Sequence, residues 1–314
     1  MYSMHVISRF CLFKQKTAYE IPLRLVGSEM CTSDRLLAID LPGVDTGIDT
    51  APEAGIAALI VLYLIAAWFN TRIPHTGVEM RPLRQDPDRS VLANALALLP
   101  DFQRCNRRLW HDKLGQISLA TTTLFWGVSG NLRYIVLAWA AVALGYSTTQ
   151  ASALVGVVAI GTAAGAMLAS IRMRLEGATR VIPLGVGMGL LVILMNFIDN
   201  IWLAVPFLIV LGGLGGFLVV PMNALLQHRG HNLMGAGRSI AVQNFNEQAC
   251  ILGLGAFYSI CTGMGLSAYT AISIFGLLVA GFMWIIQRWH AHNCIHHKDE
   301  VEHLLDIARH DNHH

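Results

Sequence analysis

The stretch IWLAVPFLIVLGGLGGFLVVPM, residues 201–222, contains no charged side chain. At 1.5 Å per residue, a helix of this length crosses the hydrocarbon core of a bilayer, which is about 30 Å thick. Because a backbone in lipid must satisfy its own hydrogen bonds, such a run predicts a membrane helix. Six further apolar stretches occur in the chain, at 55–71, 117–145, 151–171, 181–197, 239–262 and 267–287. The sequence therefore predicts an all-α polytopic membrane protein with about seven transmembrane helices.

Positive charge is distributed unevenly among the segments that join these stretches. Lys and Arg occur in four of the segments, namely 72–116, 172–180, 223–238 and the tail after residue 287. They are missing from the other three, namely 146–150, 198–200 and 263–268. Since cytoplasmic loops of membrane proteins are enriched in Lys and Arg, we expect the basic segments and the C-terminus to face the cytoplasm.

The overall composition agrees with a membrane protein. Hydrophobic residues make up 54% of the chain and charged residues 13%, whereas soluble domains contain roughly 25% charged residues. This disfavours the alternative of seven buried helices in a soluble protein. The net charge of +2 argues against a nucleic-acid partner, and basic groups at helix ends are expected to meet anionic lipid head groups. The six cysteines show no metal or redox spacing, so we predict no disulfide, metal or cofactor.

Two terminal regions differ from the rest of the chain. Residues 14–21 and 25–31 resemble translated sequencing-library adapters, so residues 1–36 are interpreted as an artefact fused to a truncated gene rather than as a natural polar tail. The C-terminal tail is rich in His but lacks zinc-finger spacing. We expect a solvated, weakly helical tail in preference to a metal site.

The domain organisation follows from these features. We expect an extracytoplasmic loop and one helix at 37–73, a cytoplasmic linker at 74–116, a six-helix half at 117–288 and a His-rich cytoplasmic tail at 289–314. Within the linker, the apolar spacing predicts an amphipathic interfacial helix from Ser90 that stops near Pro100. A second short helix is expected around Phe102, Leu109 and Trp110.

Arg133 is the most unusual residue of the predicted helices, because it lies near the middle of an apolar run of 29 residues. An arginine at this depth costs about 2.5–3.5 kcal/mol on insertion scales, so it must face a polar cavity, a partner charge or a ligand. The planar guanidinium is well suited to phosphate, because it can donate two hydrogen bonds at once. Contact with a ligand and a structural ion pair both remain open.

A second polar group lies in the 239–262 stretch. Gln243, Asn244 and Glu247 are spaced four and three residues apart, so they are expected to share one helix face. That face could bind a polar head group, pair with Arg133 or form hydrogen bonds between helices. Asn223 is expected to cap a helix end instead, and His228, Arg229 and Arg238 are expected to be solvated loop residues.

Small residues recur at 161–165 and 212–216. Glycine lets helix backbones approach closely, which matters in lipid where helices gain no hydrophobic driving force from association. We interpret both motifs as packing sites rather than as hinges. The glycines at 212–216 lie inside a predicted membrane helix, so they do not indicate a phosphate-binding loop. With no nucleophile–base arrangement either, the chain is not expected to be an enzyme.

Two blocks of sequence resemble the lysophospholipid transporter family of the major facilitator superfamily. The first comprises Thr123–Gly127, Leu132–Tyr134 and Val142–Gly145; the second comprises Gly215–Gln227, Gly235–Gly237, Ile240–Asn244 and Glu247. The resemblance covers roughly residues 55–290. It implies a carrier that moves lysophosphatidylethanolamine and lysophosphatidylglycerol across a bacterial inner membrane by alternating access of two halves. It also implies that Arg133 meets the head-group phosphate and that a cytoplasmic acyltransferase/acyl-carrier-protein synthetase reacylates the product.

The chain departs from this family in two respects: the first five helices of the family pattern are missing, and the His-rich tail goes beyond the family core. We therefore expect a fragment, the six-helix C-terminal half plus the sixth helix, that is inactive by itself. Two alternatives stay open: a drug or sugar carrier of the same superfamily, and the membrane part of a lysolipid acyltransferase fusion. No His-x4-Asp pattern follows the last helix, so an acyltransferase domain is not expected within these residues.

Overall fold

The computed structural model describes residues 51–72 and 97–310, and all regular structure in these ranges is helical. The chain divides into two compact units, Met1–Thr76 and Gly77–His314. The predicted features at residues 1–36, the stretch 90–96 of the expected amphipathic helix and the last four residues lie outside the described ranges.

The first unit contributes one described helix, α4 (Ala51–Asn70), which coincides with the first predicted apolar stretch. Its end is marked by polar contacts. The Thr71 hydroxyl donates to the Trp68 carbonyl at 2.7 Å, and the Arg72 guanidinium lies 4.8 Å from the centroid of the Trp68 ring. A Trp–Arg pair at a helix end is typical of the boundary between membrane and water.

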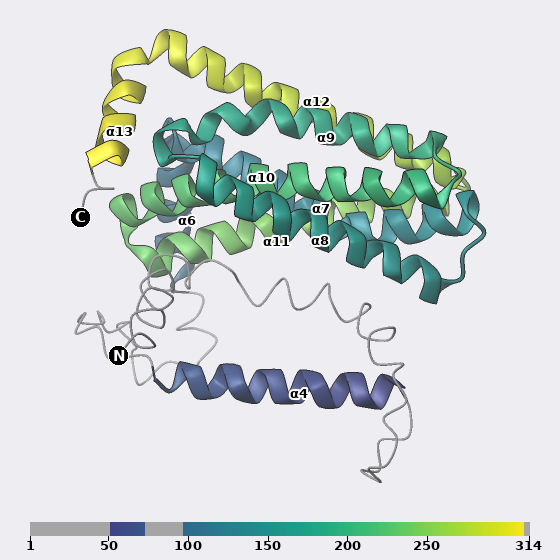
Figure 1. Cartoon of the computed structure of the whole chain (residues 1–314). Coiled ribbons are helices and arrows are strands. Elements are labelled where there is room, and N and C mark those ends of the chain that lie inside the picture. The colour runs from purple at the N-terminus through teal and green to yellow at the C-terminus, as the bar shows by residue number, and fades with distance from the viewer. Residues whose placement is uncertain (1–50, 73–96, 311–314) are drawn as a thin grey trace. The chain divides into compact units, whose positions relative to one another are not determined.

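The described helices of the second unit are, in chain order, α6 (Leu99–His111), α7 (Gly115–Ala143), α8 (Thr148–Arg172), η2 (Leu175–Val181), α9 (Ile182–Leu194), η3 (Met195–Phe197), α10 (Ile201–Met234), α11 (Ala236–Gly263), α12 (Ala268–His296) and α13 (Lys298–His310). Helices α7 to α12 run side by side (Figure 1). The shorter helices α6 and α13 lie at the same end of the bundle (Figure 1).

The helices of the bundle have the length and composition of membrane spans. In the described part of the chain, four segments are long and apolar enough to cross a membrane: α8, Leu175–Phe197, α10 and α12. Helices α7 and α11 are 29 and 28 residues long but carry more polar side chains, including Arg133 and Glu247. The prediction of an all-α polytopic membrane protein is confirmed.

Glycine contacts hold α8 against α10, as predicted for the two glycine-rich motifs. A Cβ atom added to Gly165 would collide with the backbone carbonyl of Gly213, and one added to Gly216 would collide with the carbonyl of Thr162. A second close contact joins α9 and α12, where a Cβ on Gly189 would lie 2.5 Å from the Ala280 nitrogen. These backbones approach so closely that only glycine fits.

Helix α10 is longer than the sequence predicts. It continues through Pro221 to Met234, and a single residue, Gly235 with φ of +85°, separates it from α11. Proline within a membrane helix is tolerated where neighbouring groups compensate for its missing N–H. Three expectations are therefore wrong: Asn223 does not cap a helix end, and neither His228 nor Arg229 is a loop residue.

The tail is also more ordered than expected. Residues 298–310 form α13, and its apolar stripe of Val301, Leu304 and Ala308 is buried. The Arg309 side chain donates a 2.7 Å hydrogen bond to the Glu176 carboxylate in η2. The expectation of a solvated, weakly helical tail is wrong for this segment, because three apolar residues at i, i+3 and i+7 give the helix a face to bury.

Candidate substrate-binding site

A cluster of three polar side chains, two of them buried, connects α10 and α11. The Gln243 side-chain amide donates to the Asn223 oxygen at 2.7 Å and to the Glu247 carboxylate at 2.8 Å. Gln243 is 7% exposed and Glu247 is 1% exposed. A carboxylate buried this deeply in an apolar bundle is costly unless polar groups surround it, so residues of this kind in membrane helices mark substrate or ion sites.

The predicted common face of α11 is only partly formed. Gln243 and Glu247 lie together, whereas Asn244 is exposed. Successive residues of a helix point about 100° apart, so Asn244 presents its amide beside the buried cluster instead of within it. Asn223 takes the third place in the cluster, and its distance of 20 positions from Gln243 hides the pairing in the sequence.

Arg133 lies on the exposed side of α7, where its described contacts are with Tyr134 and not with Glu247. The guanidinium donates to the Tyr134 hydroxyl at 2.7 Å and its central carbon lies 4.6 Å from the ring centroid. These contacts orient the guanidinium but leave most of its five N–H donors available, because the hydroxyl accepts from one nitrogen. The position suits contact with an anion that approaches from outside this unit.

A buried asparagine fixes α7 against α11 close to Arg133. Asn131 donates to the Gly127 carbonyl in its own helix at 2.7 Å and to the Ile251 carbonyl of α11 at 3.1 Å. It is 4% exposed. The helix that carries Arg133 is therefore tied directly to the helix that carries Glu247, a contact that residue spacing alone does not reveal.

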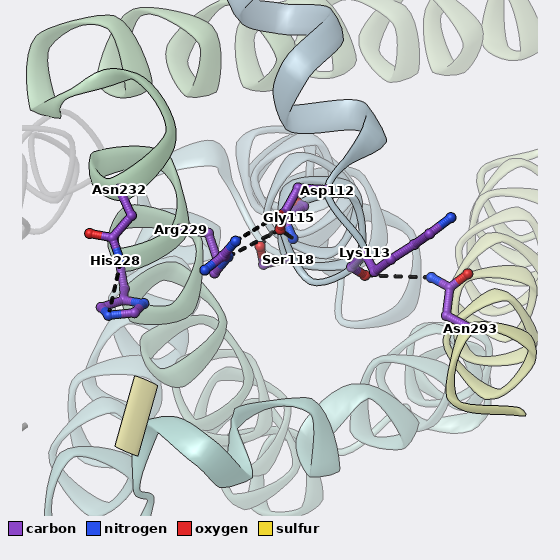
Figure 2. A network of polar contacts seen from close by, with 8 residues as sticks. All are labelled: Asp112, Lys113, Gly115, Ser118, His228, Arg229, Asn232 and Asn293. Atoms are coloured by element: carbon purple, nitrogen blue, oxygen red, sulfur yellow. Dashed lines mark hydrogen bonds and ion pairs between the residues drawn. The ribbon is translucent and has the colours of Figure 1, made fainter. Parts of the chain in front are cut away.

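A second polar network holds the end of the bundle where α6 meets α7 (Figure 2). Arg229 of α10 forms two hydrogen bonds with Asp112, at 3.1 and 2.6 Å, and both side chains are less than a tenth exposed. Asp112 also accepts from the Gly115 backbone at 2.7 Å, so it caps the first turn of α7. On the far side, Asn293 of α12 donates to the Lys113 carbonyl at 3.4 Å.

This network also shows that Arg229 is buried, although it was expected to be solvated. A carboxylate 117 positions away neutralises it, and helix spacing within one segment cannot reveal such a partner. Arg238, by contrast, is an exposed residue at the start of α11, where it pairs with Asp101 at 3.1 Å. We regard the Asp112–Arg229 network as structural, because its charges are already mutually satisfied.

The described residues offer no group of three or more His, Cys, Asp or Glu side chains that could hold a metal ion. The histidines at the end of α12 instead interact in a pair, with the rings of His292 and His296 stacked at 4.0 Å.

An all-helical bundle of apolar spans, with an exposed arginine on α7 and a buried glutamate on α11, defines a polytopic membrane protein. Comparison with curated proteins identifies the relatives. The lysophospholipid transporter LplT from Yersinia pestis (strain Pestoides F) and that from Yersinia pseudotuberculosis serotype O:3 (strain YPIII) are each 35% identical over 244 residues. The match covers 75% of this chain and 57% of each relative. Over these 244 residues the chain resembles the lysophospholipid transporter family.

The chain thus spans a little over half the length of the curated relatives it matches. No protein-family profile and no solved structure matches it. The resemblance that the sequence motifs carry is confirmed, and the helical fold agrees with the major facilitator superfamily. The relatives carry the name of a transporter rather than of an enzyme, in keeping with the sequence-based expectation.

Proposed function

We propose that this chain takes part in moving lysophospholipids across the bacterial inner membrane. The observation that carries the proposal is its 35% identity to proteins named lysophospholipid transporters. We further propose that lysophosphatidylethanolamine and lysophosphatidylglycerol are the substrates and that the site opens to each side of the membrane in turn. The six-helix half at 117–288 would form one wall of the path, with the linker and the C-terminal tail in the cytoplasm.

The substrate's chemistry suits the two groups of polar residues. A lysophospholipid has an anionic phosphate, a polar head and one acyl chain. Arg133 would bind the phosphate, because a guanidinium can donate two parallel hydrogen bonds to phosphate oxygens. Its placement on the exposed side of α7, next to Tyr134, supports this role.

The α11 residues would recognise the remainder of the head group. The Glu247 carboxylate suits an ethanolamine ammonium, and the amides of Gln243 and Asn244 suit glycerol hydroxyls. The exposed position of Asn244, one residue from the buried Gln243, supports an approach from the open side of α11. A cytoplasmic acyltransferase would then use the delivered lysolipid, a further part of the proposal.

Arg133 offers the direct test. We expect Arg133→Ala to weaken the binding of radiolabelled lysophosphatidylethanolamine to the purified chain in nanodiscs by about tenfold or more. The reason is that a hydrogen bond to a charged group contributes about 1.5–3 kcal/mol, and 1.4 kcal/mol corresponds to tenfold. The equivalent change in the full-length Yersinia pestis relative should abolish lysolipid uptake by spheroplasts.

Arg172→Ala is the matched control, because Arg172 is an exposed arginine at the end of α8 outside the proposed site. It should leave both binding and uptake unchanged. Competition by an excess of sugar or of a hydrophobic drug separates the proposal from other carriers of the superfamily. Binding that survives Arg133→Ala, with normal protein levels, would contradict the phosphate role. Competition by sugar but not by lysolipid would contradict the proposed substrate class.

A further inference from the structure

Helix α6 contacts the part of α11 that carries the candidate site. The residues on α11 alternate between two partners. Val242 and Asn246 face α6, where Val242 is buried in a cluster with Cys105 and Leu109. Gln243 and Glu247, each one position further on, form the polar cluster with Asn223 of α10. Two turns of α11 are therefore held between α6 on one side and α10 on the other.

Asn246 is the polar centre of the α6 contact. Its amide nitrogen donates to the Asn106 side-chain oxygen at 2.9 Å and to the Val242 carbonyl at 2.8 Å. Its oxygen accepts from the Trp110 indole N–H at 3.3 Å. Both N–H donors and the oxygen of this amide are thus in use, so its orientation is fixed.

Two further contacts extend the α6–α11 junction. The rings of Phe102 and Phe245 meet edge to face, with centroids 5.1 Å apart. Asp101 of α6 pairs with Arg238 at the start of α11 at 3.1 Å. The apolar face of α6 is therefore committed to the protein, although an amphipathic helix of this kind would otherwise be free to lie on lipid.

We propose that α6 is a positioning element for the candidate site: through Asn106 and Trp110 it sets the rotation of α11 about its axis, and with it the placement of Gln243 and Glu247. The physical reason is that two successive turns of a helix rotate about its axis as one rigid body. Asn246 and Glu247 are adjacent, so a rotation that breaks the Asn246 contacts also shifts the carboxylate relative to Asn223. This proposal rests on the proposed function for its ligand.

The first test is a double-mutant cycle on the affinity for lysophosphatidylethanolamine, measured on the full chain in nanodiscs. Asn106 and Asn223 lie on different helices, and each forms a hydrogen bond with a different residue of α11. We expect Asn106→Ala and Asn223→Ala each to weaken binding by about fivefold to tenfold. The loss of affinity in the double variant should be clearly smaller than the product of the two single losses. Independent effects that multiply would overturn the proposal.

The conservative variant separates positioning from packing. Asn106→Asp retains the oxygen that accepts from Asn246 and should bind lysolipid within about twofold of the wild type, whereas Asn106→Leu has nearly the same volume and loses the acceptor. Asn196→Ala is the matched control, because Asn196 also bonds between helices, to Tyr269 and Ser273 of α12, away from α11. Asn196→Ala should leave the affinity for lysolipid unchanged. Combined with Asn223→Ala, it should give the affinity expected if the two effects simply multiply.

A second readout requires no ligand. Hydrogen exchange of the backbone at residues 236–250 should become faster in Asn106→Ala and Asn106→Leu, and should remain at the wild-type rate in Asn106→Asp and Asn196→Ala. Unchanged exchange in Asn106→Ala overturns the proposal, as does faster exchange with unaltered affinity. If the wild-type chain binds no lysolipid, the proposed function fails, and the exchange rates alone decide whether α6 positions α11.

Discussion

The Arg229 guanidinium on α10 binds the Asp112 carboxylate, 117 positions earlier in the chain, through hydrogen bonds of 3.1 and 2.6 Å. Asp112 also caps α7 through the Gly115 backbone, so one carboxylate joins the α6–α7 corner to α10. The side chains are 6% and 8% exposed, which protects the pair from screening by salt. The pair thus anchors the start of the helix that carries Arg133.

We predict that Asp112→Asn destabilises the chain by about 3 kcal/mol, because removal of one partner leaves an uncompensated buried charge. Thermal unfolding in detergent should show this loss. The double variant Asp112→Asn with Arg229→Met should be more stable than the single variant. Glu302→Gln, in an exposed pair with Lys298 at 3.6 Å, should change little. Equal stability of the single variant and the wild type would contradict the anchoring role.

A methyl group at Gly165 should disrupt the α8–α10 interface. The added Cβ would collide with the Gly213 carbonyl, a backbone atom that cannot move by itself. We predict a loss of about 1–3 kcal/mol or more from overpacking. Gly253→Ala is the matched control, because a Cβ there meets nothing within 4 Å. That change should stabilise α11 slightly, since alanine is the better helix former. Unfolding midpoints of the two variants should therefore move in opposite directions.

The docking of α13 should depend on its apolar face more than on its ion pair. Leu304 is 8% exposed, and Leu304→Ala should cost about 2–3 kcal/mol of docking free energy. The hydrogen bond from Arg309 to the Glu176 carboxylate raises the pKa of Arg309, so the guanidinium stays charged throughout the neutral range. Exposure to solvent weakens that pair, and Arg309→Gln should have the smaller effect. Hydrogen exchange of residues 298–310 measures the loss of docking in each variant. A larger loss in Arg309→Gln than in Leu304→Ala would contradict the prediction.

Tyr134 should tune the proposed phosphate contact without being essential to it. Tyr134→Phe removes the 2.7 Å hydrogen bond from Arg133 but keeps the aromatic ring against the guanidinium. We predict a change of less than about fivefold in lysolipid affinity, because this hydrogen bond orients the guanidinium without touching the ligand and the ring contact remains. Tyr134→Ala removes the ring as well and should weaken binding further. If the two variants bind equally, the ring contact has no part in orienting Arg133.

Several features of the fold could be predicted because they depend on properties of single segments. Apolar runs long enough to cross a bilayer indicate the helices wherever they occur, since lipid leaves the backbone few alternatives. The glycines of α8 and α10 indicate close packing for a similar reason, because the small side chain is itself the requirement for contact. The short helix around Phe102, Leu109 and Trp110 was predicted from its apolar spacing and is confirmed as α6.

Other features depend on contacts between segments. The sequence suggested that Asn223 and Arg229 lie at a helix end or in a loop, because Pro221 is a frequent helix breaker. Helix α10 continues because its neighbours satisfy both residues with polar contacts: Gln243 bonds to Asn223, and Asp112 bonds to Arg229. The sequence likewise predicted no contact for Asn246, although this residue connects α6 to α11.

The sequence by itself determined that this chain crosses a membrane many times, that the glycine motifs of α8 and α10 are sites of close packing, and that Arg133 and Glu247 are polar groups at apolar depth. Hydropathy and residue size are local properties, and they act the same way in any arrangement of helices. Only the tertiary structure decided that Gln243 links Glu247 to Asn223, that Arg133 lies on the exposed side of α7 and that Asn246 binds α6. These outcomes depend on the rotation and register of each helix, which are set by the neighbours against which it packs.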